Sequence, residues 1–507
     1  MLLRVKVKHL IAFPLDLLDE GESKNKVAQN YNRCIKGLLK MFNFTGNYTD
    51  KYQLTMAQVY FLKGLKDDAI FDYFFRKLPF KGGYAVFAGL KDFLEILENF
   101  SFTKDDVEYL SEQGFHPQFL NYLKNFRFKG NIYSCQEGEI VFPLCPIVRV
   151  EASIIEAQII ETVLLNIINF QSLIATKANR MRQVAGERKL LEFGLRRAQG
   201  PGGFYASRAA MVGGFNATSN VYAGQKYGLP ISGTMAHSFI QQYNDELSAF
   251  RDFANYWPND CILLVDTYNS LKSGLPNAIT VGKEMKERGQ QLKGIRLDSG
   301  DLAYLAKMSR QMLDSAGLHQ VQIIVSNQLD EYVIKSLIDQ EAPIDAFGVG
   351  TNLAVGHPDA ALDGVYKLAF SNNKARIKLS ENISKITLPG KKQVYRLLDQ
   401  RRNFMGADVI ALNDEKAIPK MHHPLDISKS LSIQDIEKQP LLQKVMEKGK
   451  SLLGSIALSN IAQYRQERFN QLSEEYKRFD NPHIYKVGLS SALRDERDAL
   501  IKQFKDL

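Results

Sequence analysis

The stretch Glu192–Phe239 reads EFGLRRAQGPGGFYASRAAMVGGFNATSNVYAGQKYGLPISGTMAHSF. It places an arginine pair, two glycine-rich turns and one histidine beside strand-like runs. Cations next to exposed backbone amides in glycine-rich turns are typical of sites that bind phosphate groups. The same stretch also begins a regular alternation of strands and helices, and this alternation predicts the fold.

Strand-like runs alternate with amphipathic helical segments over about 190 residues. Pro276 stands where the first turn of a helix tolerates proline, and Gly289 and Gly317 stand where helices would end. Six or seven such units predict a parallel sheet covered by helices, for which a barrel is the economical arrangement. Because the count falls short of eight, we expect an irregular barrel. The expected strands are 190–197, 228–236, 261–267, 292–298, 321–326 and 346–350.

Composition indicates a globular protein with more than one core. A chain of 507 residues exceeds what one core usually supports, which suggests two or three domains. Helical spacing of apolar residues over 154–182 predicts a long, largely buried helix that joins two domains. The net charge of +9 is spread along the chain without a basic run. This distribution disfavours a nucleic-acid partner and fits small anionic substrates.

The four cysteines and the apolar segments indicate in which cellular compartment the protein is expected. No C-x-x-C spacing occurs, so neither a zinc site nor a disulfide scaffold is expected, and reduced core thiols fit better. The N-terminus has no clear cleavage site, and the apolar stretch 162–176 is too short for a membrane span. We therefore expect a cytoplasmic protein with no membrane span. The cysteines are Cys34, Cys135, Cys145 and Cys261.

In barrel folds, the catalytic and binding residues lie at the carboxyl ends of the strands. Applied to the expected strands, this rule gathers cations, two carboxylates, a histidine and a glycine-rich turn around one cavity. The set, in strand order, is Arg196 and Arg197, Thr234 and His237, Asp266, Arg296 and Asp298, Ser326 and Asn327, and Gly348, Gly350 and Thr351.

Each of these residues also has a structural interpretation. Asp298 and Ser299, followed by Asp301, could cap the next helix. Gly348 and Gly350 could serve only a turn, and adjacent arginines on a strand point to opposite faces, so at most one of Arg196 and Arg197 would enter the barrel. An isolated histidine such as His237 is more often a core residue than a catalyst, although histidine also serves as a nucleophile or proton shuttle.

Several longer strings make the chain resemble the nicotinate phosphoribosyltransferases. Besides the opening stretch, they are Thr49–Met56 (TDKYQLTM), Phe75–Gly89 (FRKLPFKGGYAVFAG), Leu264–Tyr268 (LVDTY), Ile295–Asp301 (IRLDSGD), Gly348–Thr351 (GVGT), Pro389–Arg396 (PGKKQVYR) and Asn481–Ser490. The likeness covers about residues 48–490.

The resemblance implies transfer of phosphoribose from phosphoribosyl pyrophosphate to nicotinate, coupled to ATP hydrolysis, in NAD biosynthesis. It also implies an irregular, incomplete β/α barrel of the type II phosphoribosyltransferase kind with a flanking α+β domain built from both chain ends, in a homodimer with composite sites. The expected parts are an N-terminal extension (1–45), the flanking domain with its connecting helix (46–185), the barrel (186–385) and a C-terminal part that completes the flanking domain (386–507).

The resemblance also assigns roles in binding the base. Phe193 and Arg296 match positions that enclose the pyridine ring in the related nicotinamide enzyme, and Tyr52 matches a tyrosine from the partner subunit. At Ser219 the nicotinamide enzyme has an aspartate, which would repel the carboxylate of nicotinate, so serine favours the acid. Thr234 and Arg296 could complete this recognition.

The remaining candidate residues are assigned to phosphoribosyl pyrophosphate and ATP. Asp266 and Asp298 are candidates for the ribose hydroxyls or Mg²⁺, which would be carried by the pyrophosphate and need few protein ligands. His237 matches the family histidine that ATP phosphorylates. Arg196, Gly348, Gly350 and Thr351 are candidates for the phosphates, and Arg76, Lys81 and Lys177 are further candidates for pyrophosphate.

Three other functions stay open at this stage. A nicotinamide phosphoribosyltransferase would share the barrel and the histidine, but Ser219 argues against it. A non-catalytic, metabolite-binding homologue should have lost part of the charge set, whereas His237, Arg296 and Asp298 are all present. A nucleic-acid-binding protein would show salt-sensitive retention on DNA.

Overall fold

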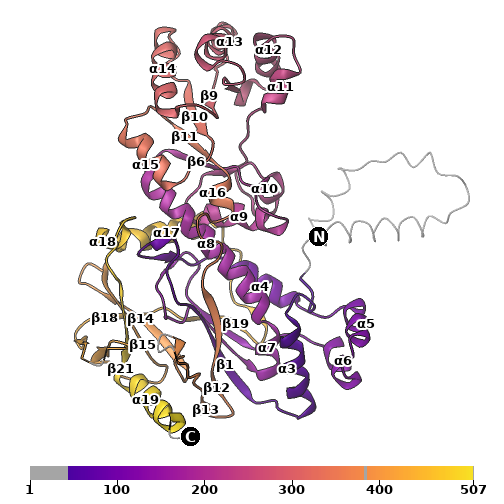
Figure 1. Ribbon diagram of the computed structural model, residues 1–507, viewed down its shortest axis with the longest axis vertical. Coiled ribbons are helices and arrows are strands. Elements are labelled where there is room, and N and C mark those ends of the chain that lie inside the picture. The colour runs from indigo at the N-terminus through magenta and orange to yellow at the C-terminus, as the bar shows by residue number, and fades with distance from the viewer. Residues whose placement is uncertain (1–43, 382–384, 427, 506–507) are drawn as a thin grey trace, which may run out of the picture. The chain divides into compact units, whose positions relative to one another are not determined.

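The computed structural model describes residues 44–381, 385–426 and 428–505 (Figure 1). Residues 45–507 form one compact unit. The expected N-terminal extension, 1–45, therefore lies almost entirely outside the described residues. Within the described part, the strands form one six-stranded parallel sheet, two flanking sheets of seven and six strands, and a two-stranded pair, Ala85–Val86 (β2) with Ile140–Val141 (β4).

The parallel sheet is the barrel expected from the sequence. Its six strands run in the order β7-β6-β11-β10-β9-β8, and every neighbouring pair is parallel. In the described residues β8 does not pair with β7, so the barrel stays incomplete, as predicted. The strands are Lys189–Glu192 (β6), Ala217–Thr218 (β7), Ile262–Leu264 (β8), Gly294–Leu297 (β9), Gln322–Ser326 (β10) and Ala346–Val349 (β11).

Two of the expected strand positions are wrong. The segment 228–236 forms only an isolated bridge between Ile231 and Thr218, and the strand at this place is the short β7. Pro230 lacks the amide hydrogen that a ladder needs at this point. The first strand ends at Glu192, because Gly194 starts a turn in which its carbonyl accepts from the amide of Arg197. The arginine pair therefore lies in this exposed turn and not on opposite faces of a strand.

The helices between these strands begin and end where the sequence signals predict. Pro276 lies in the first turn of α13, and Gly289 and Gly317, with φ of 73° and 74°, follow α13 and α14. Asp301 caps α14, its carboxylate accepting from the amide of Tyr304 at 3.0 Å, which leaves Asp298 outside the cap. The helices of this part are Pro201–Val212 (α9), Val221–Tyr227 (α10), His237–Gln241 (α11), Glu246–Tyr256 (α12), Leu275–Glu287 (α13), Leu302–Ser315 (α14), Glu331–Asp339 (α15) and Thr351–Ala354 (α16).

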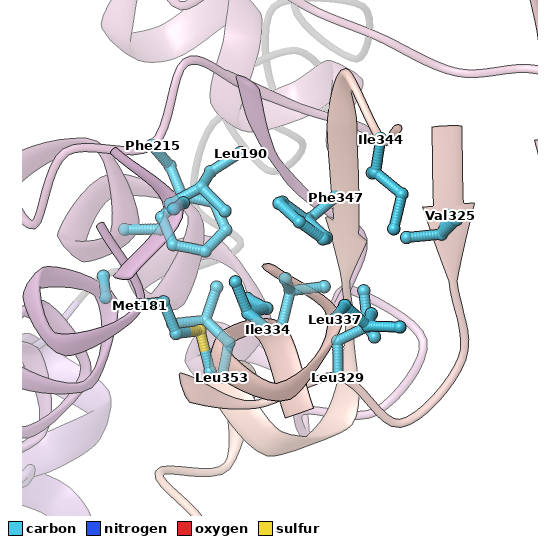
Figure 2. Close-up of a cluster of buried hydrophobic side chains, with 14 of the residues drawn as sticks. Met181, Leu190, Phe215, Val325, Leu329, Ile334, Leu337, Ile344, Phe347 and Leu353 are labelled. Carbon is cyan, nitrogen blue, oxygen red and sulfur yellow. The ribbon is translucent and has the colours of Figure 1, made fainter. Parts of the chain in front are cut away.

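A long buried helix runs between the barrel and the flanking sheets. The predicted helix 154–182 is found as Ile154–Ile159 (α7) and Glu161–Ala185 (α8), which are separated at Ile160. Figure 2 shows part of the core shared by α8 and the barrel: Met181 of α8, Leu190 of β6, Phe347 of β11, and Ile334 and Leu337 of α15 belong to one cluster of buried hydrophobic side chains. This core fixes the barrel strands against α8 and so fixes the strand ends.

Segments from both chain ends build the flanking sheets, as predicted. The seven-stranded sheet has the order β13-β12-β1-β5-β3-β19-β20, and the six-stranded sheet has the order β17-β16-β21-β15-β14-β18. The first consists of Lys374–Ala375 (β13), Gly364–Ser371 (β12), Asp68–Phe75 (β1), Val148–Ser153 (β5), Asn131–Ser134 (β3), Gln443–Glu447 (β19) and Lys450–Ser451 (β20). The second consists of Ser430–Ser432 (β17), Lys420–His422 (β16), Lys486–Ser490 (β21), Phe404–Leu412 (β15), Lys392–Leu398 (β14) and Glu437–Pro440 (β18).

Helices surround these flanking sheets (Figure 1). They are Lys51–Leu62 (α3), Leu90–Asn99 (α4), Lys104–Glu112 (α5), Pro117–Lys124 (α6), Leu458–Gln471 (α17), Glu474–Lys477 (α18) and Ser491–Lys505 (α19). The expected domain boundaries themselves stay predictions.

A buried carboxylate ties the two ends of the chain together. Glu139, just before β4, contacts Arg396 of β14 at 2.5 Å and Arg468 of α17 at 2.9 Å. Arg396 also pairs with Asp408 of β15 at 2.9 Å, and Tyr464 donates to Glu139 at 2.5 Å. All four charged side chains are at least nine-tenths buried. The network therefore fixes the C-terminal strands and α17 to the N-terminal half of the flanking part.

The cysteines agree with the expected core thiols as far as the structure describes them. Cys135, Cys145 and Cys261 are free and buried, and burial raises the pKa of each thiol, to about 12 for Cys261. Cys34 lies outside the described residues. In the described ranges, no helix has both the length and the apolar character that crossing a bilayer requires.

Candidate active site

Arg296 is the central cation at the carboxyl ends of the barrel strands. Its guanidinium donates to Ser326 Oγ at 2.9 Å, to Thr234 Oγ1 at 3.0 Å and to Asp298 Oδ1 at 3.0 Å. The guanidinium carbon lies 5.5 Å from the centroid of the Phe193 ring. Three fixed acceptors from different segments orient a planar cation beside an aromatic ring, which is the arrangement needed to bind a flat anionic ring.

Gly348 leaves the space in which Phe193 lies. A Cβ built on Gly348 would come within 2.6 Å of the Phe193 ring and 3.3 Å of Ser326 Cβ. The backbone amide of Phe193 also donates to the carbonyl of Val349 at 2.8 Å. The sequence suggested that Gly348 contacts a phosphate; in the structure its missing side chain makes room for the ring, and a phosphate role stays a prediction.

Glu192 positions this part of the site and was missed by sequence reasoning. Its carboxylate is fully buried and accepts from Ser207 Oγ at 2.8 Å, from Thr218 Oγ1 at 2.5 Å and from the amide of Gly194. Its backbone carbonyl accepts from the amide of Ser219 at 2.8 Å. The signal that could have revealed it is an acidic residue at the end of an apolar, buried strand, directly before Phe193.

Ser219 and Thr234 are brought to the same end of the barrel. Ser219 follows β7 directly and is half-buried, and its hydroxyl makes no hydrogen bond within the described residues. Thr234 accepts from Arg296, as noted, and donates to the carbonyl of Met235 at 3.3 Å. Thr234 and Arg296 are therefore in direct contact, and their joint role in recognising the base stays a prediction.

Asp266 and Asp298 lie next to one another beyond Arg296. Asp266 Oδ2 accepts from the amide of Asp298 at 2.9 Å and from Ser299 Oγ at 2.6 Å. Asp298 accepts from Arg296 and Ser326. The Asp266 side chain is only 2% exposed, and its Oδ1 is buried without a hydrogen-bond partner. A buried carboxylate oxygen without a donor is a position that a ligand hydroxyl or a cation would satisfy.

His237 stands beside this free oxygen. It begins α11, its side chain is 42% exposed, and its Nε2 lies 4.0 Å from Asp266 Oδ1. Its Nδ1 lies 3.1 Å from Thr267 Oγ1, a partner that sequence reasoning did not single out although Thr267 directly follows Asp266. The imidazole is thus oriented from one side and open to solvent on the other, unlike a core histidine.

Other expected site residues do not contact Arg296, Asp266 or Asp298 within the described chain. Arg196 is exposed in the turn after β6. Tyr52 lies on α3 of the flanking part, 50% exposed, where its hydroxyl donates to Glu161 Oε1 at 3.5 Å. Gly350 and Thr351 begin the four-residue α16, and Thr351 is exposed. A role for these residues therefore depends on a ligand or on a second subunit.

Lys177 is not placed to bind pyrophosphate. Its side chain is 1% exposed and pairs with Glu331 Oε2 at 2.5 Å, while Arg180 pairs with the other oxygen of the same carboxylate at 2.7 Å. Both cations lie on α8, and their partner lies on α15. The expectation for Lys177 is wrong because a buried lysine needs a fixed carboxylate, and Glu331 supplies it.

The described residues offer no ready-made metal cage. No group of three or more histidine, cysteine, aspartate or glutamate side chains among them is arranged to bind a metal ion. The unpartnered Oδ1 of Asp266 nevertheless fits one ligand of Mg²⁺, a cation that prefers oxygen and usually keeps water and phosphate ligands.

Comparison with known proteins identifies the family. Family models of the nicotinate phosphoribosyltransferase N-terminal domain, family and C-terminal domain match residues 48–169, 188–380 and 391–497. The nicotinate phosphoribosyltransferase of Bacillus subtilis is 47% identical over 455 residues, with 87% of this chain and 92% of the relative covered. The chain belongs to the nicotinate phosphoribosyltransferase family.

Further members and solved structures extend the likeness. The nicotinate phosphoribosyltransferase of Dictyostelium discoideum is 37% identical, with 94% of this chain and 90% of the relative covered. The crystal structure of human nicotinic acid phosphoribosyltransferase superposes with a TM-score of 0.81 and 31% identity, over 89% of this chain and 99% of that one. Nicotinate-nucleotide pyrophosphorylase from Pyrococcus furiosus, with a TM-score of 0.66, 24% identity and coverage of 84% and 95%, shares the fold. The expected type II phosphoribosyltransferase fold is thus confirmed.

Proposed function

We propose that this chain transfers phosphoribose from phosphoribosyl pyrophosphate to nicotinate, forming nicotinate mononucleotide and pyrophosphate for NAD biosynthesis. Membership of the family supports the reaction. The observation that carries the choice of base is the pairing of Arg296 with the Phe193 ring, 5.5 Å apart, beside the neutral Ser219. Arg296 supplies a cation, although it also pairs with Asp298 at 3.0 Å, and Ser219 adds no negative charge that would repel an aromatic acid.

The chemistry needs charges of both signs. As the bond between C1 of the ribose and the pyrophosphate oxygen breaks, positive charge develops on the sugar and the pyrophosphate leaves with the electron pair, while the pyridine nitrogen forms the new bond to C1. Asp266 and Asp298 stabilise the sugar end and its hydroxyls, and Arg296 orients the base. Charges fixed before the reaction in this way contribute about 3 kcal/mol each to lowering a barrier.

Mg²⁺ is the cofactor that these residues fit. Asp266, through its unpartnered Oδ1, with Asp298 beside it, would contribute to holding the ion, and the substrate phosphates would supply further oxygens. The ion would neutralise charge on the departing pyrophosphate.

Replacing Ser219 by aspartate should reverse the preference for the base. A carboxylate at this position would face the carboxylate of nicotinate, and like charges about 4 Å apart repel by about 4 kcal/mol at an effective dielectric constant of 20. We expect Ser219→Asp to lower kcat/KM for nicotinate relative to nicotinamide by about 100-fold, measured by competition between the two bases.

Ser219→Asn is the matched control, since it has nearly the same size as the aspartate but no charge. It should change the ratio of the two kcat/KM values by less than about tenfold. Equal ratios for the aspartate and asparagine variants would show that charge at residue 219 does not select the base.

We further propose that ATP phosphorylates His237. The lone pair of an imidazole nitrogen attacks the terminal phosphorus of ATP, the P–O bond to ADP breaks, and ADP leaves with the electron pair. The half-exposed ring, oriented by Thr267 and next to Asp266, supports this step. The phosphoryl group would add negative charge and acceptor oxygens beside the substrate pocket, which links ATP use to substrate binding.

His237→Ala should abolish stimulation by ATP and leave a slow, ATP-independent turnover, because the base and ribose contacts remain. Nicotinate mononucleotide formation with and without ATP measures the effect, and labelled ATP measures phosphate incorporation. His319→Ala, which removes an exposed histidine of the loop after α14, is the control and should keep full coupling. Unchanged coupling in His237→Ala would rule out His237 as the acceptor.

Tyr52 supports a homodimer with composite sites. This half-exposed tyrosine lies on α3 and does not join Phe193 and Arg296 within one chain. In the dimer that we propose, Tyr52 of one protomer would contact the base bound by the other. The cytoplasmic location stays a prediction.

A further inference from the structure

A cavity lies at the amino ends of two barrel strands, opposite the ends that carry the proposed active site. Its volume is about 1050 Å³, and its walls include Gly186 before β6, Asn216 before β7, Arg182 at the end of α8 and Arg465 of α17. Gly186 and Asn216 precede β6 and β7, the strands at whose carboxyl ends Phe193 and Ser219 lie. Since β6 has four residues and a strand rises about 3.3 Å per residue, about 13 Å of strand separates the two places.

Arg465 lies in this cavity as a buried cation without a carboxylate. It is 3% exposed, its Nε donates to the carbonyl of Val212 at 3.2 Å, and its Nη1 donates to Asn179 Oδ1 and Gln466 Oε1, both at 2.8 Å. Its Nη2 makes no hydrogen bond within the described residues, and it forms no ion pair there. All its acceptors are neutral.

The other buried cations of the described chain differ from Arg465 in this respect. Every other lysine or arginine that is buried has a carboxylate within 4.0 Å. The pairs are Arg149 with Glu151, Lys177 and Arg180 with Glu331, Arg208 with Glu137, Lys392 with Asp72, Arg396 with Asp408, Arg468 with Glu139, Lys477 with Glu474 and Arg497 with Asp498. Because an uncompensated buried charge is costly, the missing anion at Arg465 is a specific feature of this cavity.

A second guanidinium lies beside Arg465. Gly214, at φ 103°, separates the two: a Cβ added there would overlap Nη2 of Arg465 and come within 3.0 Å of Arg182 Cγ. Arg182 donates to the carbonyls of Gly214, Gly186 and Arg188 and to Asn216 Oδ1. It has no ion pair within 4.0 Å among the described residues, although the Glu187 carboxylate acts on it electrostatically. Burial, together with the charge of Arg182, lowers the pKa of Arg465 to about 10, and burial lowers the pKa of Arg182 as well. A bound anion would stabilise the charged form of both guanidinium groups.

We propose that this cavity is a binding site for a phosphate monoester, distinct from the active site. The guanidinium of Arg465 presents an unused Nη2 to the cavity, and arginine binds phosphate with more than one N–H donor. Lys477 also lines the wall, where it pairs with Glu474 at 2.7 Å, and Glu187 is a further carboxylate of the lining. The side-chain amides of Gln463, Gln466 and Asn470 offer partners for ligand hydroxyls. The volume accommodates a ligand up to the size of a nucleotide, whereas orthophosphate alone would fill a small part of it.

Calorimetric titration of the full chain with AMP, ribose 5-phosphate and orthophosphate tests this site. We expect wild-type protein to bind the first two, and Arg465→Gln to weaken their binding at least about tenfold. Adenosine, which lacks the phosphate, should not bind. Arg251→Gln is the matched control, since Arg251 is exposed on α12 and pairs with Glu284, and it should bind like the wild type.

Arg296→Gln locates the binding event. Binding that persists in Arg296→Gln and is lost in Arg465→Gln supports the cavity. Binding that Arg465→Gln retains at wild-type affinity would place the ligand outside the cavity and overturn the proposal. Because Arg465 also holds the carbonyl of Val212, Lys477→Gln provides a second variant and should weaken AMP at least about threefold. Absence of AMP binding to the wild type at millimolar concentration would also overturn it.

Discussion

Replacing Arg296 by glutamine should lower kcat/KM for nicotinate by about 100-fold to 1,000-fold. The guanidinium is the only cation of the described residues within contact of the Phe193 ring, and Ser326, Thr234 and Asp298 fix its plane. Glutamine keeps a polar side chain but removes the charge that would face the nicotinate carboxylate. Steady-state kinetics with both substrates varied measures the loss.

Arg296→Lys separates charge from shape. Lysine keeps the positive charge but has no planar fork, so it cannot donate to Ser326, Thr234 and Asp298 at the same time. We expect it to lose at least about tenfold in kcat/KM, with the control Arg251→Gln unaffected. If both Arg296 variants kept wild-type kinetics, Arg296 would have no role in binding the base.

Replacing Glu139 by glutamine should cost about 3–5 kcal/mol of unfolding free energy, the usual cost of breaking a buried ion pair. The change leaves Arg468 without a carboxylate partner and leaves Arg396 with Asp408 alone. Urea denaturation followed by circular dichroism measures the shift. Glu467→Gln is the matched control, because this glutamate lies on the exposed side of α17, and its variant should unfold within about 0.5 kcal/mol of the wild type.

The same carboxylate predicts a pH dependence. Burial alone would raise the pKa of Glu139, but Arg396 and Arg468 and their hydrogen bonds outweigh it and lower the pKa below its ordinary value of 4.5. A carboxyl group with a lowered pKa in the folded state stabilises the protein above its unfolded pKa, and this stabilisation is lost as the pH falls through the folded value. The difference between wild type and Glu139→Gln should therefore shrink below about pH 4.5. A difference that stays constant into strong acid would contradict the assignment.

The sequence was informative where a local pattern decides the structure. Strands β8 to β11 and the caps of α13 and α14 lie where apolar runs, Pro276, Gly289 and Gly317 predict them, since each depends on neighbours in the chain. The segment 228–236 failed because its apolar residues resemble a strand while Pro230 cannot complete a ladder. The two-residue β7 before it is too short to leave a periodic signal.

The candidate site shows the same division between local and long-range information. The strand-end rule found Arg296, Asp298, Asp266 and Thr234, which the structure brings into one set of hydrogen bonds. It could not find the Glu192 carboxylate or the partners of Lys177, because contacts with Ser207, Thr218 and Glu331 join segments far apart in sequence.

Product analysis with purified protein tests the central claim most directly. The protein is incubated with phosphoribosyl pyrophosphate, Mg²⁺ and either nicotinate or nicotinamide, with and without ATP, and the products are separated by chromatography. We predict nicotinate mononucleotide and pyrophosphate in equal amounts from nicotinate, with far less product from nicotinamide. Absence of nicotinate mononucleotide under every condition, or a preference for nicotinamide, would contradict the proposed function.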